Sequence, residues 1–325
     1  LEICKLEIGQ GKTFTRKLKS IFQRMLALSF YRCDLMTLVS CPYINCDSLV
    51  ELEIRSSSGC VAALKNTFPK LERFTFYENW IFSESSRNNQ PYSNILPNFL
   101  RRHKRLRILH LSSKSVCCSS QLMETIANNC TELTNLTLKR WHSPKTSFNF
   151  SHLKTLRKLS MLAVDLEQID HRQLIAPLEV LKSLTTLKLK LIWIGKAEPQ
   201  IFSVLSQLTN LRELHLNRAD VKQIPWSMLT QLKVLYIDQM GTKYVDSHLP
   251  HIISELTNLE ELVYNYFSVY EEKYDKLSSE VYSEIVKIVE GRPNKLILRC
   301  RLSKDLAKNY VPTKNVNLIE YTDSD

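Results

Sequence analysis

The sequence predicts an α/β solenoid built from consecutive strand-plus-helix repeats. The main observation is an apolar pattern of the form L-x-x-L-x-L, which returns along almost the whole chain of 325 residues. The second is spacing: with one longer interval, neighbouring copies lie about 20 to 29 residues apart, as in solenoid repeats. The third is that several intervening segments carry apolar residues at spacings of three and four, which is typical of amphipathic helices.

The fourth position of the pattern gives one marker for each repeat. The markers are Leu6, Leu28, Leu52, Phe74, Leu109, Leu136, Leu159, Leu187, Leu214, Leu235 and Leu262. In a strand, the apolar residues at the fourth and sixth positions point to one face, and the residues at the third, fifth and seventh positions point to the other. Stacked copies therefore form a parallel sheet with one buried face and one face open to solvent.

The segments between the strands supply the second layer. We expect helices that cover the buried sheet face at Gln121–Asn129, Gln173–Leu184, Gln200–Gln207, Ser247–Leu256 and Leu277–Glu290. The polar stretch Ser83–Ser93 falls in the longest interval between markers and is predicted to be a loop. Residues 295–302 and 316–321 are predicted to be terminal strands, because the end repeats of a stack are atypical.

The pattern resembles that of leucine-rich-repeat proteins over about residues 3–302. The resemblance implies a horseshoe solenoid with a concave parallel sheet and convex helices. The stretch from Met123 through Cys130 to Leu138 further resembles the Cys-containing repeat of the F-box leucine-rich-repeat family. We divide the chain into a solenoid at 1–302 and a C-terminal cap with an acidic tail at 303–325.

Composition limits the environment and the partners. The chain has 44 Lys and Arg against 33 Asp and Glu, a formal charge of +11 that favours an acidic partner. Its nine cysteines are odd in number and lack a C-x-x-C spacing, so we expect reduced thiols and a cytoplasmic or nuclear protein. No apolar run approaches the length of a membrane span, and no signal peptide opens the chain.

No pattern in the sequence predicts catalysis or a cofactor. Gly9–Thr13 resembles the end of a phosphate-binding loop, but Leu6 stands where that motif needs a glycine. His248 and His251 lack further ligands at metal spacing, so no metal site is predicted. The basic run Arg101–Arg107 fits the C-terminus of a helix, where cations oppose the negative end of the dipole, and a nucleic-acid patch is the alternative. We expect no enzyme.

Basic residues gather at outward positions of four consecutive repeats. Equivalent positions in adjacent strands lie about 5 Å apart, so these side chains are expected to converge on one surface. The candidate partner-binding residues are Lys139, Arg140, Lys158, Lys188, Lys190, His215 and Arg218. They predict binding of an acidic or phosphorylated protein segment through charge-assisted hydrogen bonds. Aromatic residues that could stack bases are sparse there, which makes nucleic acid a weaker candidate.

The resemblance implies a protein-binding module, and specifically the substrate-recognition repeats of an F-box-like ubiquitin-ligase receptor. A segment preceding Leu1 would then recruit the adaptor of a cullin-RING ligase. A freestanding repeat scaffold or inhibitor, and the repeat domain of an immune receptor, are the alternatives that the sequence leaves open.

Overall fold

The computed structural model describes the chain in segments. These are residues 2–4, 25–31, 46–55, 63–77, 91–112, 120–141, 150–166, 172–191, 199–217, 221, 224–240, 248–267 and 276–320. The chain divides into two compact units, unit 1 at Leu1–Leu181 and unit 2 at Lys182–Asp325.

Unit 1 alternates strands with helices. In chain order its elements are β1 (Glu2–Cys4), β2 (Ala27–Tyr31), β3 (Glu51–Arg55), β4 (Arg73–Tyr77), α4 (Pro91–Arg102), β5 (Ile108–Ser112), α5 (Ser120–Asn129), β6 (Asn135–Trp141), the 3-10 helix η2 (Phe150–Thr155), β7 (Met161–Leu166) and α6 (Arg172–Leu178). Within this unit, strands β1 to β7 pair in parallel in sequence order.

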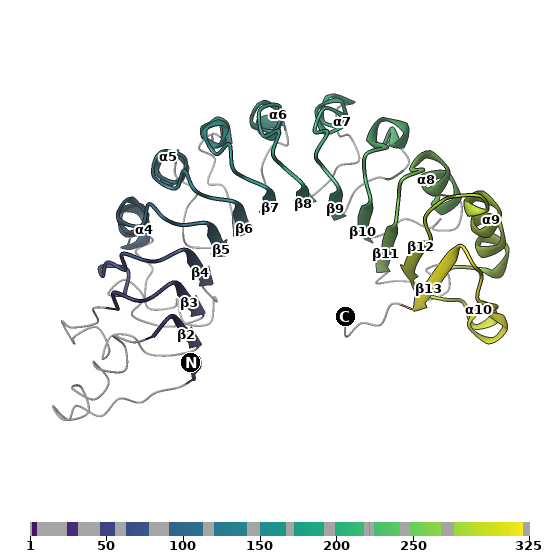
Figure 1. Ribbon diagram of the computed structural model, residues 1–325, viewed down its shortest axis with the longest axis horizontal. Helices are drawn as coiled ribbons and strands as arrows, with labels where there is room; N and C mark the ends of the chain where they lie inside the picture. Colours follow the sequence, from purple (N-terminus) through teal and green to yellow (C-terminus); the bar gives the residue numbers. More distant parts are fainter. Residues whose placement is uncertain are drawn as a thin grey trace. The chain divides into compact units, whose positions relative to one another are not determined.

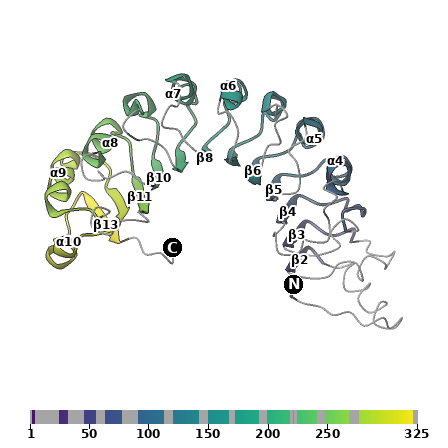
Figure 2. The same ribbon diagram turned by 180° about the vertical axis from the view of Figure 1, so that it is seen from behind.

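Unit 2 repeats the same plan. Its elements are β8 (Thr186–Leu191), α7 (Pro199–Ser206), β9 (Glu213–Asn217), the 3-10 helix η5 (Trp226–Leu229), β10 (Val234–Met240), α8 (Leu249–Glu255), β11 (Glu261–Phe267), α9 (Ser279–Val289), β12 (Leu296–Cys300), α10 (Lys304–Asn309) and β13 (Val316–Glu320). Strands β8 to β13 also pair in parallel in sequence order. In each unit the strands line one side and the helices the other (Figures 1 and 2).

Each unit is therefore a leucine-rich-repeat solenoid, as the sequence predicts. The strand register brings equivalent apolar side chains together, since Leu52 pairs with Phe74 in unit 1 and Leu214 with Leu235 in unit 2. These fourth-position side chains, like those at the sixth position, are almost fully buried toward the helices. We call the other face of each sheet, formed by the third, fifth and seventh positions, the open face.

Backbone hydrogen bonds fix this register at the start of most strands. The carbonyl oxygen of Arg107 accepts the N–H groups of Thr134 and Asn135, at 2.8 and 3.0 Å. The carbonyl oxygen of Thr185 accepts two successive N–H groups from the next repeat in the same way. Because one carbonyl satisfies two donors at each step, a slip of a single residue would leave buried backbone groups unpaired.

The register corrects two of the sequence markers. Leu136 pairs with Leu162, so Leu162 and not Leu159 occupies the fourth position of β7. Leu159 is buried, but it occupies the first position, which Leu133 holds in the preceding repeat. The sequence pattern failed here because apolar residues three apart at 156, 159 and 162 allow two alignments. In β1, Ile3 pairs with Phe30 and so takes the sixth position, which excludes Leu6 as the marker.

The helices match the predicted segments, with one clear difference in length. Helix α6 ends at Leu178, six residues before the predicted end at Leu184, because Leu181 and Leu184 belong to the turn that leads into β8. Helix α4 starts at Pro91, so Pro91–Ser93 are helical and not part of a loop. The rest of the predicted loop lies outside the described residues.

The chain ends match the predicted terminal strands. Residues 295–302 contain β12, and 316–321 contain β13, which pairs in parallel with β12. Leu318 at the fourth position of β13 is only half-buried, as expected where the stack ends. The division into a solenoid at 1–302 and a cap at 303–325 stays a prediction.

In most repeats a buried residue lies three places before the first-position leucine, and its backbone carbonyl accepts the N–H of that leucine. We call this place the turn position. It is occupied by Cys46, Phe68, His103, Cys130, Leu156, Leu208, Leu229 and Leu256. Among the described cysteines, Cys46, Cys130 and Cys300 are buried thiols. Burial raises the pKa of Cys46 to about 11 and that of Cys130 to about 12, so both thiols stay protonated at neutral pH.

His103, at the turn position before β5, is a buried residue whose ring nitrogens both contact backbone groups inside the core. It packs against Phe99 with ring centroids 4.0 Å apart. Its Nδ1 lies 2.6 Å from the carbonyl oxygen of Phe99, and its Nε2 accepts the N–H of Phe68 at 2.9 Å. This pairing requires a neutral ring protonated on Nδ1. Burial, assisted by the nearby charge of Arg102, lowers the pKa of His103 to about 4.

Replacing Leu187 by Ala should lower the free energy of unfolding by about 2 to 5 kcal/mol, because Leu187 is fully buried at the fourth position of β8. Chemical denaturation monitored by circular dichroism measures this change. Val180→Ala is the control, since Val180 is 45% exposed and its truncation should cost less than about 0.5 kcal/mol. Equal losses for the two variants would contradict the assigned core.

Acid should weaken the fold through His103. Because its pKa is about 4 in the fold and 6.5 in the unfolded chain, the unfolded chain binds the extra proton between these values and stability falls as pH drops through them. The loss should reach the order of 3 kcal/mol. His103→Leu should flatten the dependence of unfolding free energy on pH between 6.5 and 4. His251→Gln, at an exposed site on α8, should leave it unchanged.

Candidate functional site

The open face of unit 2 carries a continuous row of large side chains. At the fifth position, Lys188 pairs with His215 and His215 with Tyr236. The row continues through Val263, Arg299 and Ile319 on the next three strands. A parallel sheet therefore places one residue from each repeat side by side, although these residues are far apart in the sequence.

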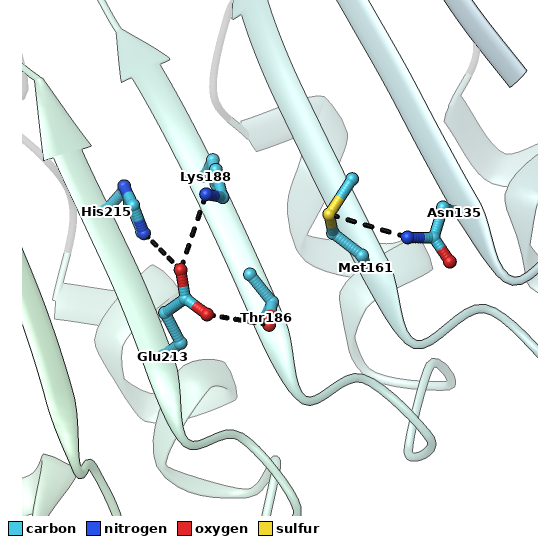
Figure 3. A network of polar contacts seen from close by, with 6 residues as sticks. All are labelled: Asn135, Met161, Thr186, Lys188, Glu213 and His215. Atoms are coloured by element: carbon cyan, nitrogen blue, oxygen red, sulfur yellow. Dashed lines mark hydrogen bonds and ion pairs between the residues drawn. The ribbon is translucent and has the colours of Figure 1, made fainter. Parts of the chain in front are cut away.

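Glu213 links the first members of this row. Its carboxylate lies 3.3 Å from Lys188 Nζ and 2.5 Å from His215 Nε2, and it accepts a hydrogen bond from the Thr186 hydroxyl at 3.2 Å. Figure 3 shows the three side chains converging on this carboxylate. Two of the predicted binding residues are thus already engaged by a neighbouring acid.

His215 is held in place from a second side. Its ring is stacked on Tyr236 at a centroid distance of 3.9 Å and an interplanar angle of 9°. Burial lowers the pKa of His215, while the hydrogen bond to Glu213 opposes this effect. The ring therefore favours the neutral form at neutral pH and provides a flat, uncharged surface.

A pocket of about 400 Å³ opens beside this stack. Five consecutive strands contribute to it, from β9 to β13. The lining residues are His215, Leu216, Asn217, Tyr236, Ile237, Asp238, Val263, Asn265, Arg299, Ile319 and Glu320. Most of them occupy the fifth or seventh position, so the pocket is a direct product of the strand register.

Polar contacts order the walls of the pocket. Asn217 Nδ2 donates to Asp238 at 2.6 Å, and Arg299 Nε donates to Glu261 at 2.7 Å. The Oδ1 atom of Asn265 is buried and has no hydrogen-bond partner within the described part of the chain. A buried acceptor without a donor is costly, which makes Asn265 the clearest sign of an interaction that a partner could complete.

The structure corrects the position of one predicted binding residue, Lys158. Lys158 lies in the turn before β7, because of the shift from Leu159 to Leu162, and its Nζ is 2.6 Å from Glu132 in the preceding turn. The prediction that Lys158 faces outward on a strand is wrong. The outward residues of β7 that pair with Asn135 and Thr137 are Met161 and Ala163, and neither is charged.

Of the remaining candidate residues, the structure describes the side chain of Lys139 but not those of Arg140, Lys190 and Arg218. Lys139 is exposed at the seventh position of β6. The backbones of Arg140 and Lys190 lie in β6 and β8, but their side chains are outside the described residues, as is the whole of Arg218. Binding of a partner by this set of residues stays a prediction.

Unit 1 has its own polar open face. Its seventh-position row contains Tyr31, Arg55, Tyr77, Ser112 and Lys139. Glu53 accepts hydrogen bonds from Ser29 at 2.8 Å and from Arg55 at 2.5 Å. The Asn135 amide contacts the sulfur of Met161 at 3.7 Å (Figure 3). This face carries both charge signs, as the contacts of Arg55 with Glu53 and of Arg73 with Glu51 illustrate.

The described residues hold neither a metal-ligand cluster nor a helix that could span a membrane. No group of three or more His, Cys, Asp or Glu side chains stands at metal-binding distance within them. None of their helices has the length and hydropathy that crossing a membrane requires.

Comparisons with known proteins give structural likeness only. No family model and no curated protein matches the chain. Among solved structures, the functional domain of InlJ from Listeria monocytogenes is 13% identical, with a TM-score of 0.36, over 95% of this chain and 70% of that one. A leucine-rich-repeat protein of Leptospira interrogans, LIC12759, is 14% identical, with a TM-score of 0.36, over 86% of this chain and 74% of its own. InlP from Listeria monocytogenes is 12% identical, with a TM-score of 0.31, over 86% of this chain and 64% of that one.

Replacing Glu213 by Gln should lower the pKa of His215 further, because the carboxylate favours the protonated ring. Titration of the His215 Cε1–H resonance by NMR measures the shift. The control variant Glu260→Gln removes an exposed carboxylate that is paired with Lys233, and it should leave the pKa of His215 unchanged. A His215 pKa that rises in Glu213→Gln would contradict the arrangement.

Proposed function

We propose that the chain is a protein-binding repeat scaffold and that the open face of unit 2 holds an extended segment of its partner. The observation that carries the proposal is the pocket formed by side chains from five successive strands, β9 to β13. Neighbouring strands lie about 5 Å apart and an extended chain rises about 3.3 Å per residue, so an extended segment that crosses the strands would pass one repeat about every one and a half residues.

The composition of this face suits a protein better than a nucleic acid. The stacked His215–Tyr236 pair lies beside the apolar Val263 and Ile319, and charged groups stand around them. An aromatic anchor beside a few fixed polar groups is typical of protein-binding hot spots. The described cations of this face, Lys188 and Arg299, are paired with Glu213 and Glu261, which weakens the case for phosphate contacts.

A finer proposal is that the repeats belong to an F-box-like ubiquitin-ligase receptor. Support comes from the turn position, which is occupied by a buried cysteine in two repeats of unit 1, at Cys46 and Cys130. The resemblance to the Cys-containing repeat therefore extends beyond the segment around Cys130. The implied partner is the adaptor subunit of a cullin-RING ligase, bound by a part of the protein outside the repeats.

A second candidate partner chemistry is the acidic or phosphorylated segment expected from the sequence. Within the described residues, unit 1 offers the better site for it. The row of seventh-position side chains contains Lys139 and Arg55, together with Tyr31 and Tyr77 from two further strands. Lys139 is exposed. Lys158 lies in a turn and does not contribute to this row.

Filling the pocket should abolish partner capture. Val263→Trp places a large ring in the pocket, whereas Met228→Trp adds the same ring at a site on η5 that is 40% exposed. We expect quantitative mass spectrometry of affinity captures from native extract to show a loss of at least about tenfold for most partners with Val263→Trp, and none with Met228→Trp. Partners retained equally by both variants would contradict the use of this face.

The same capture with the full-length protein examines the finer proposals. The receptor role is supported if a cullin-RING adaptor is recovered equally with and without Val263→Trp, because the adaptor would bind outside the repeats. Absence of the adaptor from every capture contradicts that role. Partners lost with Lys139→Glu and retained with Val263→Trp would place acidic segments on unit 1.

A further inference from the structure

We propose that the side chains of Thr313 and Tyr310 close the outer edge of β13, so that a strand from a second copy of this chain cannot add to the sheet of unit 2 there. We call these two side chains the edge clamp. They bind the backbone of β13 through their hydroxyl groups. Their role does not depend on what the open face binds.

The backbone groups of β13 alternate between its two sides. The N–H of Leu296 in β12 donates to the carbonyl oxygen of Asn315 at 2.9 Å, so the backbone groups of Asn315 point toward β12. Since successive residues of a strand direct these groups to opposite sides, the N–H groups of Val316 and Leu318 point away from β12. Strand β13 pairs with no strand beyond β12 within the described residues, and these outward groups therefore form an edge of the sheet.

The edge clamp occupies both of these outward N–H groups. The N–H of Val316 donates to the Thr313 hydroxyl oxygen at 3.1 Å, and the same hydroxyl donates to the carbonyl oxygen of Val316 at 3.4 Å. The N–H of Leu318 donates to the Tyr310 hydroxyl oxygen at 3.5 Å. In a paired strand such groups bond to the backbone of the neighbouring strand. A further strand would therefore have to displace the clamp before it could pair.

The edge clamp is anchored to α9 and α10. Tyr310 is the C-cap residue of α10, and Leu306 of that helix is buried. The Tyr310 ring packs edge-to-face on Tyr282 of α9, with ring centroids 5.7 Å apart and an interplanar angle of 64°. Asp305 of α10 accepts a hydrogen bond from Ser279 of α9 at 2.7 Å. Displacing Tyr310 would disturb this packing, which makes the clamp a stable part of the fold.

The residues of β13 offer little other protection against pairing. The strand reads Val-Asn-Leu-Ile-Glu, with a single charge at its end. Protein edges are commonly protected by lysine, by proline or by a β-bulge. Between Val316 and Glu320 there is no lysine or proline, and the register with β12 is regular. An apolar edge of this kind is a template for another strand when its N–H groups are accessible.

Two conservative substitutions remove the clamp and keep the size of the side chains. The double variant with Thr313→Val and Tyr310→Phe lacks both hydroxyl groups, and circular dichroism checks that it stays folded. Sedimentation velocity should show that it forms dimers or larger species as its concentration rises, beyond any association of the wild type. The matched control combines Thr230→Val with Tyr31→Phe at two exposed sites and should sediment like the wild type.

Amide hydrogen exchange assigns the effect to β13. In the dilute double variant the amides of Val316 and Leu318 should exchange about fivefold faster than in the wild type, because each loses one hydrogen bond. At high concentration they should become protected again by pairing with a second copy. The amide of Asn317 faces β12 and should keep its rate throughout.

The wild-type protein provides a test that does not require the variant to fold. Its Val316 and Leu318 amides should exchange more slowly than those of an unstructured peptide of the same sequence, and equal rates would overturn the proposal. A folded double variant that associates no more than the wild type would also overturn it. So would self-association that leaves the amides of Val316 and Leu318 unprotected, because the second copy would then bind elsewhere.

Discussion

The alignment of fourth-position side chains between neighbouring strands is the constraint on which the rest of the structure depends. When Leu214 lies beside Leu235, the backbone N–H groups of Lys233 and Val234 reach the carbonyl oxygen of Arg212, at 2.8 and 2.9 Å. The same alignment turns the fifth and seventh positions outward. Core packing, backbone hydrogen bonding and the composition of the open face are therefore set by one register, and a change in it would alter all three together.

This dependence explains why the pocket can be built from residues that are distant in the sequence. Tyr236, Val263 and Arg299 come from different repeats, yet each is the fifth residue of its own pattern. Polar contacts between strands then adjust the surface, as Glu213 does when it contacts both Lys188 and His215. Cross-strand pairs of this kind therefore set which side chains the open face presents.

The sequence predicts the fold well because burial repeats with a fixed period, and each strand and helix identified from apolar spacing lies close to its predicted place. It fails around Leu159, where leucines three residues apart permit two registers and only pairing with Leu136 selects Leu162. That local error placed Lys158 on the open face. The pocket could not be predicted for another reason. Asp238 and Glu261 stand at outward positions, but the sequence does not show that Glu261 binds Arg299, or that Asn265 Oδ1 lacks a donor within the described part of the chain.

Site-specific photo-crosslinking tests most directly whether the open face of unit 2 is the binding surface. A benzophenone amino acid at position 236 would stand in the pocket, and the same group at position 228 would stand on η5 at an exposed site. On irradiation in native extract, position 236 should give covalent adducts with the partners that Val263→Trp loses, and position 228 should give none of them. Adducts from position 228 alone would contradict the account and place the binding surface among the helices.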